Sequence, residues 1–153
     1  MAGKLQAEIA QSKPFDSIEA EAFLNIVKTA DILEQSVEAV LKPFGISGTQ
    51  YNVLRILRGA GSAGLSCREI GERMISHDPD VTRLLDRMEK AGHVTRGRAT
   101  SDRRVVVTQI TPEGLNLIEQ LDKPLEANLR ATVGHVDTKK LSTLIDILEL
   151  LRK

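Results

Sequence analysis

Basic and hydrogen-bonding side chains that could bind a nucleic acid gather between residues 79 and 104. Seven basic and four acidic residues give this segment a charge of +3, whereas residues 1–50, 51–78 and 105–153 carry −3, +1 and −1. The chain of 153 residues is neutral as a whole, which argues against a general polyanion binder. Because guanidinium groups bind guanine edges and phosphates through paired hydrogen bonds, this segment is the candidate site and duplex DNA its candidate ligand.

The segment predicts one helix followed by a basic hairpin. Its apolar residues fall at i, i+3, i+4 and i+7, which defines one buried stripe of a helix; they are Val81, Leu84, Leu85 and Met88. We expect Asp78 to cap this helix, Pro79 to lie in its first turn and Gly92 to end it. The β-branched runs HVTRGR and RRVVVTQI follow, with a turn at residues 99–102 between them. Such a basic helix beside a basic ribbon is typical of a winged helix on a duplex.

The polar side of this helix would face the bases. Arg83 can donate a bidentate pair to guanine O6 and N7, and Thr82 can reach a phosphate or a thymine methyl group. The alternative is a solvated face with surface ion pairs. The residues that we expect at the DNA interface are Ser66, Arg68, Pro79, Asp80, Thr82, Arg83, Arg87, Arg98, Asp102, Arg103 and Arg104.

The hairpin offers a different kind of contact. A narrow A·T-rich minor groove attracts arginine, and Asp102 can hold the guanidinium of Arg104 through a charge-assisted bond. The alternative is an ordinary turn aspartate beside a strand arginine. We expect Arg98 and Arg103 to contact phosphates, whereas Arg96 could equally be a surface charge on the strand.

The preceding sequence predicts the rest of a helix-turn-helix. Capping boxes at residues 47–50 and 66–69 open two helices, and a short helix joined by a tight turn to the basic helix is the arrangement of a helix-turn-helix. The free N–H groups at the start of the second of these helices, near Ser66 and Arg68, suit a phosphate. Ser66 could instead serve only as a cap.

Long apolar-striped helices are expected at both ends of the chain. The first covers residues 16–41 with Asp16 as its cap; residues 112–152 form two more, and Pro124 should kink or divide the first of that pair. The last helix is apolar on nearly two faces, which one chain of this size cannot bury, so a second copy would cover it. The residues that we expect in a homodimer interface are Ile18, Leu141, Ile145, Leu148 and Leu151.

The expected fold class is mainly α with a small β-hairpin wing. A flexible arm at residues 1–15 would precede a single domain at 16–153. That domain holds a winged helix-turn-helix at about 47–111, with dimerisation helices from both chain ends at about 16–41 and 112–152.

Several classes of function lack support in the sequence. There is no phosphate-binding glycine loop or nucleophile elbow, so an enzyme is not expected. The three histidines have no ligand spacing, so neither a metal nor another cofactor is expected. Aromatic residues make up 3%, too few for stacking single-stranded bases. Cys67 is the single cysteine; it excludes an internal disulfide, and we do not expect it to act as a redox sensor. Without a signal peptide or an apolar run of ~18–20 residues, we expect a cytoplasmic protein that does not enter a membrane.

Taken together, these patterns resemble the MarR family of bacterial transcription regulators over about residues 18–150. The matching runs are LKPFGISGTQYNVLRIL (41–57), LSCREIGERM (65–74), VTRLLDRMEKAGHVTR (81–96), SDRR (101–104) and ITPEG (110–114). The resemblance implies a dimer built from the first and last two helices, recognition helices in successive major grooves, and wings that reach toward the minor groove. It also implies an effector site near the junction of the dimerisation and DNA-binding lobes.

By the same resemblance, the chain would be a ligand-responsive repressor that binds a pseudo-palindromic operator in double-stranded DNA. Its effector would be a small organic molecule whose identity the sequence does not reveal. Half-sites should lie about one helical turn, ~10 bp, apart. The competing class is a winged-helix module that binds proteins and no operator, for which affinity for a duplex would not depend on salt.

Overall fold

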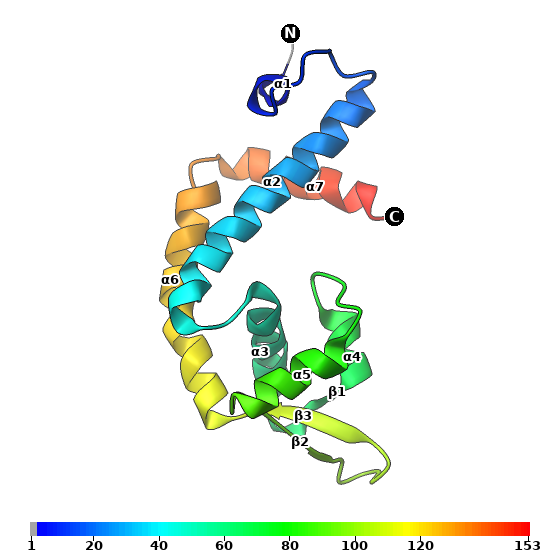
Figure 1. Ribbon diagram of the computed structural model, residues 1–153, viewed down its shortest axis with the longest axis vertical. Coiled ribbons are helices and arrows are strands. Elements are labelled where there is room, and N and C mark those ends of the chain that lie inside the picture. Colours follow the sequence, from blue (N-terminus) through cyan, green and yellow to red (C-terminus); the bar gives the residue numbers. More distant parts are fainter. Residues whose placement is uncertain (1–2) are drawn as a thin grey trace.

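The computed structural model describes residues 3–153, and it is an elongated, mainly helical chain with a small sheet at one end (Figure 1). The helices are α1 Lys4–Glu8, α2 Ile18–Leu41, α3 Gly48–Ala60, α4 Cys67–Arg73, α5 Val81–Lys90, α6 Pro112–Val133 and α7 Thr138–Leu151. The strands are β1 Leu65–Ser66, β2 Val94–Arg98 and β3 Val106–Ile110, and single 3-10 turns cover Lys42–Phe44 and Gly61–Ala63. The expected fold class, mainly α with a small β wing, is confirmed.

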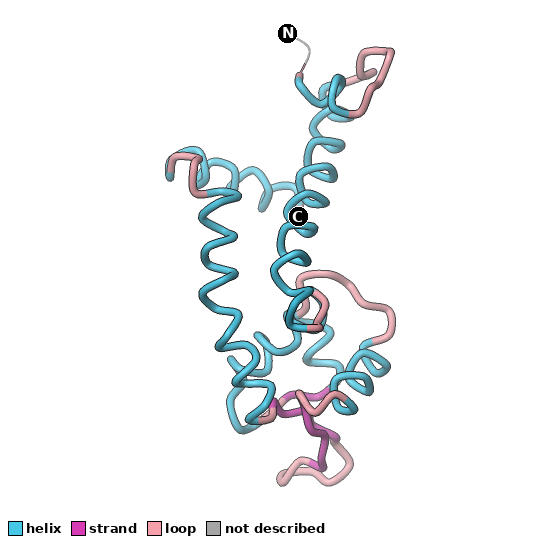
Figure 2. The backbone as a smooth tube through the Cα atoms, turned by 60° about the vertical axis from the view of Figure 1, so that its left-hand side comes forward, coloured by secondary structure: helices cyan, strands magenta, loops and turns pink. Residues whose placement is uncertain are grey.

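Helix α6 joins two lobes. Figure 1 shows α2 and α7 at one end of the molecule and α3, α4, α5 and the sheet at the other, and Figure 2 shows the same separation from a second direction. Ile118, Leu121 and Leu125 of α6 are buried. Pro124 lies inside α6, which continues past it as one helix, so the alternative that this proline divides the helix is wrong.

The buried core is aliphatic and lies mostly in the lobe that holds the sheet. Its members come from nearly every element of that lobe, from the end of α2 and from α6; they are Leu41, Ile46, Val53, Leu54, Leu57, Leu65, Ile70, Leu84, Leu85, Met88, Val94, Ile118, Leu121 and Leu125. At the edge of this core, Nη1 of Arg58 donates to both carboxylate oxygens of Asp122 at 3.0 and 2.9 Å. This ion pair fastens α3 to α6.

The sheet has three antiparallel strands in the order β1-β3-β2. The pairs run from Val94 with Ile110 to Arg98 with Val106, so β2 is an outer strand. Strand β1 has two residues and was not anticipated, because so short a strand has no detectable alternation. The expected turn at 99–102 is too short: residues 99–105 form the loop, closed by a 2.8 Å bond from the Ala99 N–H to the Val105 carbonyl.

Most helix starts agree with the sequence. The capping boxes at Ser47 and Ser66 are both complete. Thr111 accepts a hydrogen bond from the Gly114 N–H with Pro112 in the first turn of α6, and Asp137 accepts one from the Lys140 N–H at the start of α7. These side chains satisfy amide groups that a helix leaves free at its first turn.

Two expected caps are wrong by one or two positions. Ser17, not Asp16, caps α2 by accepting from the Ala20 N–H. Asp80, not Asp78, caps α5, and Asp78 instead accepts a 2.8 Å bond from the Asp80 N–H. In both places two neighbouring Ser or Asp side chains could cap the helix, and the residue preferences of the cap position do not distinguish between them. The expected place of Pro79 in the first turn is also wrong, because α5 begins at Val81 and Pro79 precedes its cap.

The N-terminal segment contains α1, whose Leu5 is 2% exposed. Residues 1 and 2 of the expected flexible arm lie outside the described part of the chain. The arm's flexibility stays a prediction, since one short helix with one buried side chain does not define its motion.

Candidate nucleic-acid interface

Helix α5 divides its side chains between the core and solvent as its sequence pattern predicts. Leu84, Leu85 and Met88 are at most 2% exposed, whereas Arg83 and Arg87 are exposed. The side chain of Arg83 is 81% exposed. Its guanidinium can therefore engage a ligand while the apolar stripe stays in the core.

The start of α5 orients Arg83. One carboxylate oxygen of Asp80 accepts from the Arg83 N–H at 3.0 Å, and the other lies 3.1 Å from Nε of Arg83. This ion pair leaves both terminal nitrogens of the guanidinium for a ligand. Asp80 is thus placed as a cap and as a partner of Arg83, while Pro79 is exposed directly before it.

Contacts between helices hold α5 in place, and the sequence did not indicate them. The Asn52 side chain, 9% exposed, accepts a 2.9 Å bond from the Ile75 N–H and so fixes the segment between α4 and α5 to α3. Sγ of Cys67 lies 3.6 Å from Oγ1 of Thr82. Thr82 is therefore exposed but in contact with the first residue of α4.

The expected phosphate contacts at the start of α4 have internal partners. Oγ of Ser66 accepts from the Glu69 N–H at 3.2 Å, and Glu69 accepts from the Ser66 N–H at 2.8 Å. The latter hydrogen bond is the main reason that the pKa of Glu69 lies below its usual value. Arg68 pairs with Glu72 at 2.9 Å and remains exposed. Ser66 is thus a cap here, and Arg68 a surface ion-pair partner.

The wing consists of β2, the loop at residues 99–105 and β3. Arg104 lies in this loop, at the tip of the wing. Oδ1 of Asp102 accepts from the Arg104 N–H at 2.9 Å and from its Nε at 3.4 Å, while the Arg104 side chain is 92% exposed. The expected pairing of these two residues is present. Nη1 of Arg98 donates to the Arg103 carbonyl at 3.1 Å, so Arg98 braces the wing as well as adding charge, and the Arg103 side chain is exposed.

Arg96 has a structural partnership that the sequence left open. Its Nη2 donates to Asp86 at 2.5 Å and to Glu89 at 3.0 Å, and its side chain is 24% exposed. The hydrogen bond from Arg96 is the largest cause of the lowered pKa of Glu89. Arg96 therefore links the wing to α5. Asp86 and Glu89 lie at i and i+3 on α5, a spacing that could have suggested a shared partner.

Helix α5 and the hairpin of β2 and β3 lie at the same end of the molecule, away from α7 (Figure 1). The exposed arginines of α5 and the wing are Arg83, Arg87, Arg98, Arg103 and Arg104. A convex helix beside a projecting ribbon, both cationic, can contact a groove and the adjoining phosphates at once.

The opposite lobe exposes apolar side chains. Ile18, Ile145 and Leu151 are 77%, 55% and 63% exposed, and Leu141 and Leu148 are half-buried. All five residues predicted for a dimer interface are thus at least partly accessible in the single chain.

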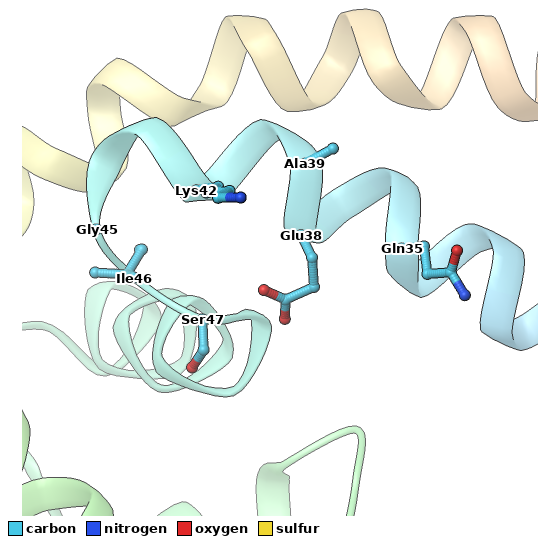
Figure 3. Close-up of a pocket in the computed structure, with 7 residues that line it drawn as sticks. All are labelled: Gln35, Glu38, Ala39, Lys42, Gly45, Ile46 and Ser47. Atoms are coloured by element: carbon cyan, nitrogen blue, oxygen red, sulfur yellow. The ribbon is translucent and has the colours of Figure 1, made fainter.

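A hollow of about 540 Å³ lies between α2 and the start of α3 (Figure 3). Its lining mixes charged, polar and apolar groups; the residues are Gln35, Glu38, Ala39, Lys42, Gly45, Ile46 and Ser47. Glu38 accepts a 2.7 Å bond from the Gly48 N–H. The hollow is therefore at the junction of the two lobes, with one wall from each.

Within residues 3–153, no group of three or more His, Cys, Asp or Glu side chains is arranged to hold a metal ion. No helix in this part of the chain is both long and apolar enough to cross a membrane. Cys67 is a partly exposed free thiol.

The helix-turn-helix with its wing defines a winged-helix protein, and comparison with known proteins identifies its family. The sequence model of the MarR family matches residues 46–106. A solved MarR transcription factor from Planctomyces limnophilus is 36% identical, with a TM-score of 0.68, and the match covers 89% of this chain and 98% of that one. The chain belongs to the MarR family and is a DNA-binding transcriptional regulator, not an enzyme.

Two further comparisons extend over most of the chain. The HTH-type transcriptional regulator FarR of Neisseria gonorrhoeae is 26% identical over 140 residues, which is 92% of this chain and 94% of FarR. A mutant of MarR from Escherichia coli, solved in complex with operator DNA, matches with a TM-score of 0.76 at 21% identity and covers 97% of this chain and 99% of that one. The latter likeness concerns the fold.

Proposed function

We propose that this regulator binds a pseudo-palindromic operator as a homodimer and represses transcription until a small organic molecule releases it. The observation that supports this most is the division of the molecule into a cationic end and an apolar end. Exposed arginines lie on α5 and the wing, and exposed apolar side chains lie on α2 and α7. One end suits DNA and the other suits a second copy.

The helices at the chain ends support the dimer. Of the 24 residues of α2, Leu41 alone is buried, and α7 has no buried residue in this chain. Water would contact the apolar residues of both helices in a monomer, at an unfavourable free energy of about 25 cal/mol per Å². The exposed apolar residues of α7 are Leu144, Ile145, Ile147, Leu150 and Leu151.

Arg83 is the residue that we assign to base recognition. Asp80 orients it, its terminal nitrogens are available, and bidentate bonds to guanine discriminate between bases. Thr82, Arg87, Pro79 and Asp80 would lie beside it in the major groove.

The other predicted contacts are assigned to the backbone and the minor groove. Arg104, oriented by Asp102, would enter a narrow minor groove. Arg98 and Arg103 would contact phosphates, and Arg68 would do so with the amide groups at the start of α4. Ser66 contributes to that site through its cap.

The effector is proposed to bind in the hollow beside Glu38 and Lys42. A ligand there contacts both lobes, so it can favour a spacing of the two recognition helices that fits the operator poorly. An organic molecule that releases operator from the wild type should release it less well from Lys42→Ala. We propose the cytoplasm of a bacterium as the regulator's place of action, because the family that it belongs to consists of transcription regulators, whose operators lie there.

Selection of duplexes from a random library tests the operator proposal. The enriched sequences should contain an inverted repeat whose half-sites lie ~10 bp apart from centre to centre, because a dimer presents two recognition helices to one face of the duplex. Enrichment of single half-sites would contradict the dimeric reading, and no enrichment at all would contradict operator binding.

A further inference from the structure

Three hydrogen bonds that join β2 to α5 all involve Arg96. Nη2 of Arg96, on β2, bonds to Asp86 and Glu89, which lie on α5. The backbone N–H of Arg96 also donates to the second oxygen of Glu89 at 3.0 Å. Glu89 thus holds both the side chain and the main chain of the same residue. Three bonds to one residue define a position more narrowly than a single surface ion pair does.

The place of Arg96 in the sheet explains why the wing needs this link. Strand β2 is an outer strand, so one row of its N–H groups has no neighbouring strand. The Glu89 carboxylate accepts a hydrogen bond from one of these N–H groups, that of Arg96. It therefore acts as a lateral partner of β2 on the side that faces α5.

Burial of the hairpin ends at this point. Val94 and Thr108 are 2% and 1% exposed, while Gly97, Arg98 and Val106 are exposed. Beyond Arg96 no core packing fixes the direction of the hairpin. On the β2 side of the hairpin, the bonds of Arg96 are the last lateral contact before the tip, whereas on the β3 side the pairing with β1 extends to Val107, opposite Gly97.

The tip itself is internally braced. Ala99 donates to the Val105 carbonyl, Val105 to the Asp102 carbonyl at 3.0 Å, and Arg98 to the Arg103 carbonyl. Arg104 is held on this tip by Asp102. These bonds connect the residues of the tip to one another, so the direction of the hairpin decides where the Arg104 guanidinium lies relative to α5.

From this geometry we propose that Arg96 is a positioning residue: bound to Asp86 and Glu89, it sets the angle between the wing and α5, so that Arg104 and Arg83 reach the same operator together. The inference rests on the proposed contact of Arg104 with DNA. Arg96 itself need not touch DNA, since its guanidinium is turned toward α5.

A simpler role must be distinguished. Asp86 and Glu89 lie on α5, and their charges would repel phosphates if Arg96 did not offset them. Loss of Arg96 would then weaken binding without any change in the wing. Charge compensation would weaken binding without changing the contribution of Arg104, whereas loss of positioning would remove that contribution.

A double-mutant cycle with operator duplex separates the two roles. In the wild type, Arg104→Ala should weaken binding about tenfold; in the Arg96→Met background the same change should have an effect of less than about twofold. Equal effects of Arg104→Ala in both backgrounds would overturn the proposal. No effect of Arg104→Ala in the wild type would instead overturn the proposed wing contact, so the two failures are distinguishable.

A variant with no charge at positions 86, 89 and 96 tests charge compensation directly. Asp86→Asn, Glu89→Gln and Arg96→Met together leave no unpaired carboxylate on this face but also no ion pairs. Positioning predicts that this triple variant still binds about tenfold more weakly than the wild type and is insensitive to Arg104→Ala. Binding as tight as the wild type, with full sensitivity to Arg104→Ala, would overturn positioning in favour of charge compensation.

Arg58→Met is the matched control. It breaks an ion pair between Arg58 of α3 and Asp122 of α6, whose side chains are 34% and 48% exposed and which includes no residue of the wing. It should leave the effect of Arg104→Ala at its wild-type size. Thermal unfolding of each variant measures stability separately. If Arg58→Met reduced the effect of Arg104→Ala as much as Arg96→Met does, the proposal would be overturned, because general destabilisation would then explain both reductions.

Discussion

The guanidinium of Arg83 is exposed to solvent but is held in position by Asp80. Its ion pair with Asp80 engages Nε at 3.1 Å, which limits the rotamers of a side chain that would otherwise lose more conformational entropy on binding. An arginine held in this way is suited to read one base pair instead of making a general charge contact.

Replacing Arg83 with alanine should weaken operator binding by ~1–3 kcal/mol and relax the preference at one base pair per half-site. Competition with a panel of single-base operator variants measures both effects. Arg130→Ala is the control, since Arg130 forms a similar exposed ion pair with Glu126 on α6, far from α5; it should change neither. Equal losses on every duplex would mean that Arg83 contacts phosphate alone.

The residue types at the candidate site could be read from the sequence, but their partners only in part. Asp102 and Arg104 are two positions apart, so their pairing could be expected from local reach. The partners of Arg96 are seven and ten residues away across a helix end, and the contact of Cys67 with Thr82 crosses two helices. Such contacts depend on tertiary packing, which periodicity does not specify.

At the scale of elements, α5 depends on one cap. Asp80→Ala should lower the free energy of unfolding by ~0.5–2 kcal/mol, because the Arg83 N–H loses its acceptor. Asp80→Asn keeps an oxygen acceptor but removes the carboxylate, so it should restore most of the stability. Urea unfolding of both variants provides the measurement. If the two variants lose the same stability, the charge of Asp80, not its capping oxygen, is what stabilises the helix.

The contact between α5 and β2 also has a pH signature. The Arg96 guanidinium holds the pKa of Glu89 below its usual 4.5. A lowered folded-state pKa gives stability that is present above 4.5 and is lost as the pH falls through the folded-state value. An NMR titration should show the Glu89 pKa rising in Arg96→Met. An unchanged Glu89 pKa would contradict the ion pair.

The apolar pattern predicted which helices the chain forms. It predicted neither the exact ends of the elements nor the strand β1. The stripe of α5 is buried as expected, and the boxes at Ser47 and Ser66 begin their helices at the expected places. Strand β1 is defined by its pairing with β3, from Leu65 with Thr108 to Ser66 with Val107. A two-residue strand exists only through such a partner, so the local sequence contains no signal for it.

At the scale of the whole molecule, two exposed helices require an explanation that one chain does not supply. Ile145→Glu should convert the proposed dimer to monomers and weaken operator binding, since a charge would be buried at the interface. Ile145 is 55% exposed in the single chain, so the change should leave the protomer folded. Sedimentation equilibrium measures the oligomeric state.

Ile75→Glu is the control for this change. Ile75 is 81% exposed but lies between α4 and α5, in the other lobe. This variant should remain dimeric. Dimers of Ile145→Glu, or monomers of both variants, would contradict the assignment of α7 to the interface.

The central claim is that two weakly charged copies together bind a duplex through several phosphates. In each copy, residues 79–104 carry a net charge of only +3, and the whole chain is neutral. If the dimer neutralises about eight phosphates, the logarithm of its affinity should fall with the logarithm of salt with a slope of about −7. Fluorescence anisotropy of the selected operator duplex, measured across a salt series, tests this directly. A steep linear fall is the predicted result, and an affinity that does not change with salt would contradict DNA binding by α5 and the wing.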